Sequence, residues 1–310
     1  MRWKRGSRLK LVSEAEASPP ICAIFDEVRH SLGVPTVPIL YQAYAVVPKF
    51  LELHWEALRP ALSTRMFFHM GERLAAEAYT RAQSYFAIPD LQSLGEDDRK
   101  NEAGDSSISG LVGALTYYQY LDPLLVLITA AQMQAFDGVV GSLDPRVESG
   151  SPNAIVRAPE LAAEEMAGAA LQSIWEERRR TFDLAFVPDE HRAAAMWPRT
   201  YQQCWTAVKE LIASPLYADC QYRIGESAWR LVRDLPVAIE TDISRLLEAG
   251  VSGEEISVLA GVNESLYGAF TGMLLDVTFM RIACEGGSHH EGRDYKTATE
   301  QEEQAGSRAA

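Results

Sequence analysis

Apolar residues recur with helical spacing along most of the chain. Between residues 23 and 32, Ile24, Val28 and Leu32 lie four positions apart and form one stripe of a helix. Residues 48–62 begin with a proline, which the first turn of a helix accepts because an N–H there would have no helical partner. The same period continues in three further segments, residues 65–86, 227–235 and 255–262. The pattern predicts a helical protein.

Two local signals refine this prediction. Ser252 followed by Glu255 forms a capping box, which predicts that a helix begins there. The run LLVLITAA at residues 124–131 has the composition of a buried strand. Pro123 in front of it and the polar QMQAF behind it favour a buried helix instead. The fold class that follows is all-α.

Three short blocks occur twice in the chain, in the same order. Two of the pairs are 150 residues apart and the third is 148 residues apart. The pairs are IFDEVR (24–29) with IWEERR (174–179), PKFLELHWEA (48–57) with PRTYQQCWTA (198–207), and ISGLVG (108–113) with ISVLAG (256–261). A period of this length is the size of a domain rather than of a solenoid repeat. We infer a tandem duplication of one helical unit.

Changes in composition divide the chain further. The predicted parts are a basic N-terminal segment (1–15), repeat 1 (16–140), a Gly-, Pro- and Ser-rich linker (141–158), repeat 2 (159–285) and a disordered tail (286–310). Two copies of one unit bury their apolar faces best against each other, which gives an intramolecular pseudo-dimer. A ligand pocket is then expected between the repeats.

Charge and cysteine content narrow the function classes. A net charge of −14 argues against a nucleic-acid partner, which requires a clustered basic surface. The basic start is followed by the polar VSEAEASPP rather than by an apolar run, and no apolar stretch reaches the length of a membrane span, so we expect a cytoplasmic protein without a membrane partner. The four cysteines form no CxxC pair and suggest isolated reduced thiols. His289 and His290 lie in the predicted tail, and we expect neither a metal site nor a cofactor.

Three motifs resemble a known family. They are GVPTVPILYQAYAVVPKFLELHW (33–55), YLDPLLVLITA (120–130) and MWPRTYQQCW (196–205), and the chain is similar to the group I α-haloacid dehalogenases, also called halocarboxylic acid dehalogenases, from about residue 20 to Cys284. The resemblance implies an all-α pseudo-dimer with its active site between the repeats. It also implies hydrolysis of short 2-halo acids without a cofactor. An aspartate of the second repeat would activate water, which attacks Cα with inversion and without a covalent ester.

The resemblance implies two alternative bases. The catalytic aspartate of the family lies seven residues before a Trp-Pro pair, and seven residues before Trp197 stands Glu190. The segment is shorter here than in the family, so a gap would instead bring Asp189 into that place. A simpler interpretation is that both acids stabilise the first turn of a helix. We expect the next residue, His191, to be a solvated helix residue.

The remaining pocket positions of the family match this chain less well. They correspond to Thr36, Ile39, Asp122, Leu125, Tyr267 and Phe270, of which Tyr267 and Phe270 keep the aromatic character. Asp122 stands where the family has an asparagine. It would either cap a helix that begins at Pro123, or face the pocket and share a proton with the base. In the pocket it would repel a substrate carboxylate.

Three functions therefore compete. The first is a cofactor-free hydrolase that uses Glu190 or Asp189 against a small 2-halo acid or a related acid. The second is a small-ligand-binding relative of the same fold without catalysis, and the third is an interaction module of paired helical domains. We allow for a homodimer in each case.

Overall fold

The structure, a computed structural model, describes residues 11–91, 108–142, 148–150 and 158–288. This part of the chain is built of α-helices, with two short 3₁₀ helices, η2 (Glu164–Met166) and η3 (Val232–Asp234). The α-helices are α1 (Pro19–Leu32), α2 (Ile39–Tyr44), α3 (Pro48–Leu62), α4 (Arg65–Tyr85), α5 (Ile108–Asp137), α6 (Ala169–Phe182), α7 (Asp189–Ala194), α8 (Pro198–Ile212), α9 (Pro215–Leu231), α10 (Ile243–Glu248) and α11 (Gly253–Cys284). The described residues contain two isolated β-bridges, Thr64 with Ser149 and Val140 with Ile239, and no longer strand, which confirms the all-α class.

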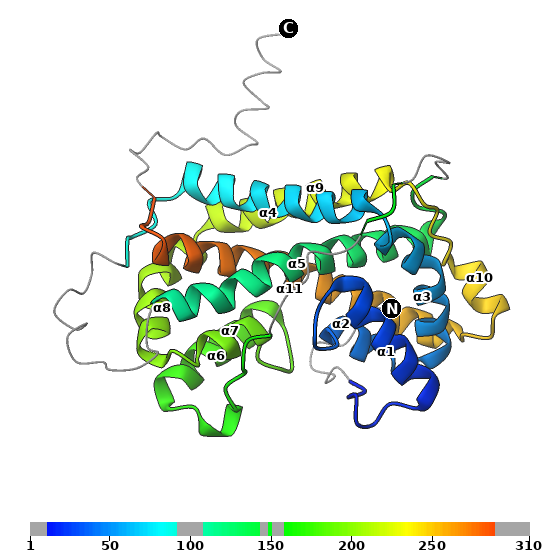
Figure 1. The fold of residues 1–310 in the computed structure, drawn as a ribbon, viewed down its shortest axis with the longest axis horizontal. Coiled ribbons are helices and arrows are strands. Elements are labelled where there is room, and N and C mark those ends of the chain that lie inside the picture. The colour runs from blue at the N-terminus through cyan, green and yellow to red at the C-terminus, as the bar shows by residue number, and fades with distance from the viewer. Residues whose placement is uncertain (1–10, 92–107, 143–147, 151–157, 289–310) are drawn as a thin grey trace, which may run out of the picture.

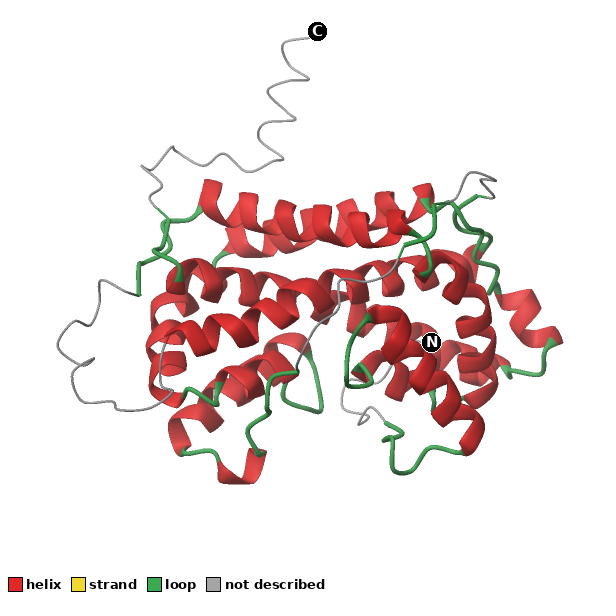
Figure 2. Cartoon of the chain, viewed as in Figure 1, coloured by secondary structure: helices red, strands yellow, loops and turns green. Residues whose placement is uncertain are grey.

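The helices form three layers (Figure 1). The two longest helices, α5 and α11, pack against each other and occupy the centre. Helices α4 and α9 lie side by side on one face of this pair and contact both of its members. On the other face, α1–α3 and α6–α8 form two separate groups, one toward each end of the central pair (Figures 1 and 2).

The helix order repeats along the chain. Helices α1, α2, α3 and α4 begin 150 residues before α6, α7, α8 and α9 respectively. This is the offset of two of the duplicated motifs, so the helix starts support the predicted duplication. The pseudo-twofold relation between the halves and the predicted boundaries stay predictions. Most of the predicted linker, nearly all of the predicted tail with His289 and His290, and residues 1–10 lie outside the described residues.

Several local predictions can be compared directly with the structure. Pro48 does open a helix, and Ser252 and Glu255 form the predicted capping box. The run at 124–131 is helical, as expected. The prediction that Asp122 caps a helix was wrong, because α5 continues through Pro123 without a break, and Asp122 lies in its middle.

The hydrophobic core lies around the central helix pair, α5 and α11. By length and composition alone α5 and α11 would suit membrane spans, but 72% and 83% of their apolar windows are buried inside the structure. They are the core helices of the bundle. All four cysteines are free, and Cys204, Cys220 and Cys284 are buried there. The expectation of cysteines outside any disulfide is confirmed, and the side chains of Cys204 and Cys284 neighbour each other in the core.

Candidate active site

A cavity of about 50 Å³ lies where α5 and α11 meet the starts of α2 and α7. This is several times the ~10–15 Å³ that a single water requires. Positions at the predicted repeat offsets line it in pairs, namely Thr36 with Phe186, Pro38 with Pro188, Ile39 with Asp189, Asp122 with Phe270, and Leu125 with Met273. Residues from both predicted repeats therefore line the cavity.

Two of its carboxyl groups are almost fully buried. Asp122 and Glu190 are each 2% exposed, and Asp122 Oδ2 and Glu190 Oε1 have no hydrogen-bond partner. Asp122 comes from the middle of α5, and Glu190 comes from the first turn of α7. A first-turn position is favourable for an acidic residue, so the simpler interpretation of Glu190 also holds. Its burial at the cavity, however, goes beyond what a helix terminus needs.

Burial raises the pKa of both groups. The pKa of Asp122 lies well above its usual range because of burial first, and then because of the charges of Asp189 and Asp276. The pKa of Glu190 is raised in the same way by burial and then by Asp122. For both groups, burial favours the protonated form, and for Glu190 the nearby charge of Asp122 adds to this effect.

Asp189 has a different environment from its neighbour. Its side chain lines the cavity yet stays 43% exposed, and Oδ1 lies 3.5 Å from Arg192 Nη1 on the next turn of α7. Burial raises its pKa, and Arg192 partly opposes that effect. Asp189 is thus the acid of this site that water reaches most readily.

The other walls are mostly apolar or phenolic. Leu125, Phe270 and Met273 contribute buried apolar surface. Tyr117 and Tyr118 of α5 also line the cavity, and the Tyr117 hydroxyl lies 3.4 Å from Thr36 Oγ1. None of the described residues that line the cavity is a lysine or an arginine. The sequence analysis did not anticipate the two tyrosines.

The structure brings most of the predicted site residues together. Those at the cavity are Glu190, Asp189, Asp122, Thr36, Ile39, Leu125 and Phe270. Tyr267 is the exception, and its predicted place in the pocket was wrong. Its side chain turns toward α9, donates a hydrogen bond of 2.5 Å to the carbonyl of Gly225, and lines a separate groove of about 290 Å³.

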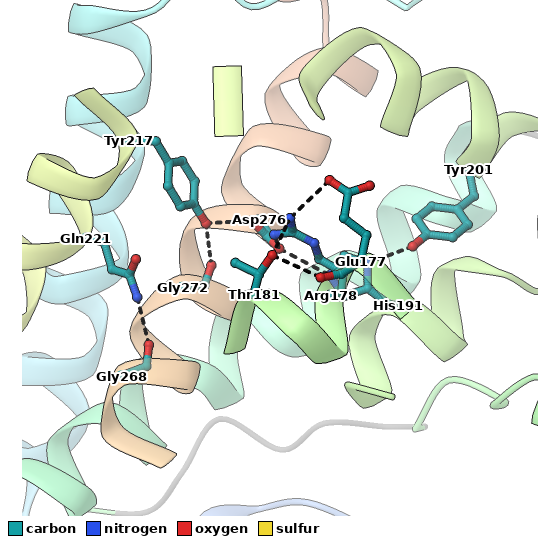
Figure 3. A network of polar contacts seen from close by, with 10 residues as sticks. All are labelled: Glu177, Arg178, Thr181, His191, Tyr201, Tyr217, Gln221, Gly268, Gly272 and Asp276. Carbon is teal, nitrogen blue, oxygen red and sulfur yellow. Dashed lines mark hydrogen bonds and ion pairs between the residues drawn. The ribbon is translucent and has the colours of Figure 1, made fainter. Parts of the chain in front are cut away.

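The prediction that His191 is solvated was also wrong, because its side chain is 0% exposed. Figure 3 shows the polar network that holds it. His191 Nε2 lies 3.2 Å from Asp276 Oδ2, and His191 Nδ1 lies 2.7 Å from the Tyr201 hydroxyl. Arg178 Nη1 donates to the same Asp276 oxygen at 3.1 Å, and the Tyr217 hydroxyl donates to Asp276 Oδ1 at 2.5 Å.

Charges within this network are well compensated. Burial alone would raise the pKa of Asp276, but the charge of Arg178 and the hydrogen bonds from His191 and Tyr217 outweigh it, so the pKa lies below its usual value. Burial lowers the pKa of His191. A neutral His191 donates from Nε2 to Asp276 and accepts from Tyr201 at Nδ1. The guanidinium of Arg178 also stacks over Trp205, 4.6 Å from the ring centre.

The network fixes the helix that carries the candidate bases. Asp189, Glu190 and His191 are consecutive residues of α7, and the backbone carbonyl of His191 accepts a hydrogen bond of 3.3 Å from Trp175 Nε1. The sequence analysis missed Arg178 and Asp276. The repeat offset offered a signal, because Val28 stands 150 positions before Arg178 and Ile128 stands 148 positions before Asp276. Among the described residues, no group of three or more His, Cys, Asp or Glu side chains could hold a metal ion.

Solved structures with this fold are similar to the chain over most of its length. A D-2-haloacid dehalogenase mutant has a TM-score of 0.81 at 21% identity, and the match covers 92% of this chain and 98% of that one. A complex of D-2-haloacid dehalogenase with L-LA has a TM-score of 0.80 at 21% identity, with coverage of 92% and 100%. At this level of identity the match concerns the fold alone.

Sequence relatives and a family model extend the comparison. An (R)-2-haloacid dehalogenase of Pseudomonas putida is 24% identical over 88% of this chain and 92% of its own length. A configuration-inverting 2-haloacid dehalogenase of Alcaligenes xylosoxydans xylosoxydans is 27% identical, with coverage of 81% and 85%. The family model described as halocarboxylic acid dehydrogenase DehI matches residues 35–191, which is about half of the chain. The chain therefore belongs to the DehI family.

Proposed function

We propose that this protein is a hydrolase that releases halide from Cα of a small 2-halocarboxylic acid, with inversion, by using water activated by a carboxylate of α7. The observation that carries the proposal is the acidic start of α7 at a largely apolar cavity, in a chain of the DehI family. The relatives named as 2-haloacid dehalogenases, one of them as configuration-inverting, support the reaction class.

Asp189 is our candidate for the general base. A base must be ionised and must reach water. Asp189 meets both conditions better than Glu190, because its side chain is partly exposed and lies near Arg192. Glu190 is buried beside Asp122, and its pKa is raised further. The moderately raised pKa of Asp189 makes it a stronger proton acceptor than an ordinary carboxylate.

The reaction then balances as follows. The Asp189 carboxylate takes a proton from water while the water oxygen bonds to Cα. The carbon–halogen bond breaks on the opposite side, and halide leaves with the bonding electrons. The product is the 2-hydroxy acid of inverted configuration, and Asp189 returns its proton to solvent. Leu125, Phe270 and Met273 give the halogen an apolar surface.

Halide release by the purified protein tests the proposal. Both enantiomers of 2-chloropropionate are supplied, halide is measured, and the configuration of the lactate product is determined. We expect release with inversion, and a loss of at least about 100-fold in kcat for Asp189→Asn, the range assigned to general base catalysis. Glu254→Gln is the matched control, because it removes an exposed first-turn acid of α11. A larger loss for Glu190→Gln than for Asp189→Asn would make Glu190 the base.

A second candidate is a binding protein for a small ligand, without turnover. The described residues that line the cavity include three acidic side chains and neither lysine nor arginine. This favours the binding function, because a substrate carboxylate meets no positive partner among them. Thermal shifts with small acids separate the two functions, since a ligand that binds the native state stabilises it without turnover. Stabilisation without halide release from any 2-halo acid would select the binding function.

A further inference from the structure

Two residues that line the cavity each carry a carboxyl oxygen that requires a partner. Asp122 Oδ2 and Glu190 Oε1 are buried without a hydrogen bond, and both residues line the cavity. Buried polar atoms in native proteins almost always have a partner. An unsatisfied pair of residues that lines a cavity therefore points to a ligand that supplies hydrogen bonds to their carboxyl groups.

The groups around the pair leave it in an acidic environment. Several titratable and charged side chains face the pair or its direct neighbours. They are Tyr117 and Tyr118 on α5, Asp189, His191 and Arg192 on α7, Glu177 and Arg178 on α6, Glu164 on η2, Tyr201 on α8, Tyr217 on α9, and Asp276 on α11. The two arginines are engaged, Arg178 with Asp276 at 3.1 Å and Arg192 with Asp189 at 3.5 Å. Neither lines the cavity.

An anionic ligand in this cavity faces repulsion unless the acid pair gains a proton. A carboxyl group that keeps its proton is a hydrogen-bond donor, whereas an ionised one only accepts. A hydrogen bond from a neutral carboxyl to a carboxylate is charge-assisted and short. The carboxyl groups of Asp122 and Glu190 become suitable contacts for a ligand carboxylate once they are protonated.

We propose that a small carboxylic acid binds this cavity together with a proton, which Asp122 and Glu190 hold and donate as a hydrogen bond to the carboxylate of the ligand. The inference rests on the proposed function, since it concerns how the same site recognises the acid group. By linkage, the affinity for the acid falls as pH rises past the range in which the free pair loses its proton. Asp122 and Glu190 together thereby make acid recognition proton-dependent.

Calorimetry with propionate tests this inference without turnover, because propionate has no halogen. Titrations of the full chain in two buffers of different ionisation enthalpy, between about pH 5 and pH 9, give the Kd and the number of protons taken up. We expect uptake to approach one proton per propionate at high pH, where the Kd rises tenfold per pH unit. Propionamide, which is neutral, should bind with no such pH dependence.

Asp122→Asn provides the matched variant. Its amide donates at every pH and leaves Glu190 as the single acid of the pair, so we expect a smaller proton uptake than in wild type, and tighter propionate binding than wild type at about pH 9. Three results would overturn the inference. They are propionate binding to wild type that does not change with pH, a proton uptake in Asp122→Asn equal to that of wild type, and no propionate binding at any pH. The propionamide comparison on wild type decides the question even if the variant fails to fold.

The two proposals fail separately. Proton-linked propionate binding without halide release from 2-halo acids would contradict the proposed hydrolysis and leave the inference standing. Halide release with a KM that does not change with pH would contradict the inference and leave the hydrolysis standing.

Discussion

The N-terminal and C-terminal halves of the molecule have helices in the same order but carry different side chains on them. At positions 150 residues apart, the first half has Val28, Ile39, Tyr41 and Leu51 where the second has Arg178, Asp189, His191 and Tyr201. On the central helices, Ile128 of α5 stands at the offset of 148 from Asp276 of α11. Of the residues drawn in Figure 3, Arg178, Tyr201 and Asp276 thus stand where the first half has the buried apolar residues Val28, Leu51 and Ile128.

Features that shape the backbone are retained in both halves. Helices α1 and α6 both end on a left-handed residue, Gly33 with φ of 66° and Asp183 with φ of 53°. Thr64 and Ser214 both cap the following helix. The comparison teaches that the same order of helices accommodates different core chemistry, which agrees with function being located in a site rather than in a fold.

The largest effect is expected from breaking the charged network of the second half. Arg178→Val leaves the Asp276 carboxylate buried without its cation, which costs about 3–5 kcal/mol of the free energy of unfolding. The double variant Arg178→Val/Asp276→Ile restores the residue types of the first half, and we expect it to recover most of that loss. Urea unfolding measures both. Equal losses in the single and the double variant would contradict this interpretation.

The buried histidine of the first half gives the next largest effect. His54 hydrogen-bonds to the neutral Gln132, and burial lowers its pKa from 6.5 to about 4. As pH falls, the unfolded state therefore binds a proton at a higher pH than the folded state does. The stability that His54 contributes above pH 6.5 is lost progressively as the pH falls to about 4. The loss amounts to about 3 kcal/mol. Between these pH values, the free energy of unfolding of His54→Leu should fall by less than that of wild type. An equal fall in the two proteins would contradict the assignment.

The acid pair at the cavity has the opposite pH dependence. The pKa of Asp122 is raised in the folded state, so the unfolded state ionises first and stability falls as pH rises above the ordinary aspartate pKa. Asp122→Asn should therefore be more stable than wild type by roughly 1–3 kcal/mol at about pH 8, because a buried carboxylate without a partner is removed. The gain should vanish below about pH 4, where both states are protonated. A gain that persists in acid would show that charge is not its cause.

The smallest effect concerns the shared caps. Thr64 accepts from Phe67 N at 3.3 Å, and Ser214 accepts from Tyr217 N at 3.2 Å. Thr64→Ala and Ser214→Ala should each cost about 1 kcal/mol. Chemical denaturation compares the two variants side by side. Costs that differ by more than about 1 kcal/mol would argue against equivalent roles in the two halves.

Local sequence patterns predicted the helices well. Period, prolines and caps act within a few residues, which is why the starts at Pro48 and Gly253 were predictable. Asp189, Glu190 and Asp122 entered through the family resemblance, and the structure shows them at one cavity. Their burial could not be predicted locally, since it depends on how α5 and α7 pack.

The two misplaced residues have the same explanation. His191 stands in the polar stretch DEHR, which looks solvated in sequence, but Trp175, Tyr201 and Asp276 from other helices enclose it. Tyr267 shares a helix with Phe270, and the partner that turns it away from the cavity is Gly225 on α9. Contacts between distant helices decide both positions, and a single sequence does not reveal such contacts.

The most direct test of the account is a single turnover in ¹⁸O-labelled water, with enzyme in excess over 2-chloropropionate. If water activated by a carboxylate of the second half attacks Cα, the first lactate formed carries ¹⁸O, and the peptide that contains Asp189 and Glu190 gains none. Unlabelled lactate from the first turnover, followed by ¹⁸O in that peptide, would show that a carboxylate attacks Cα itself and would contradict the account.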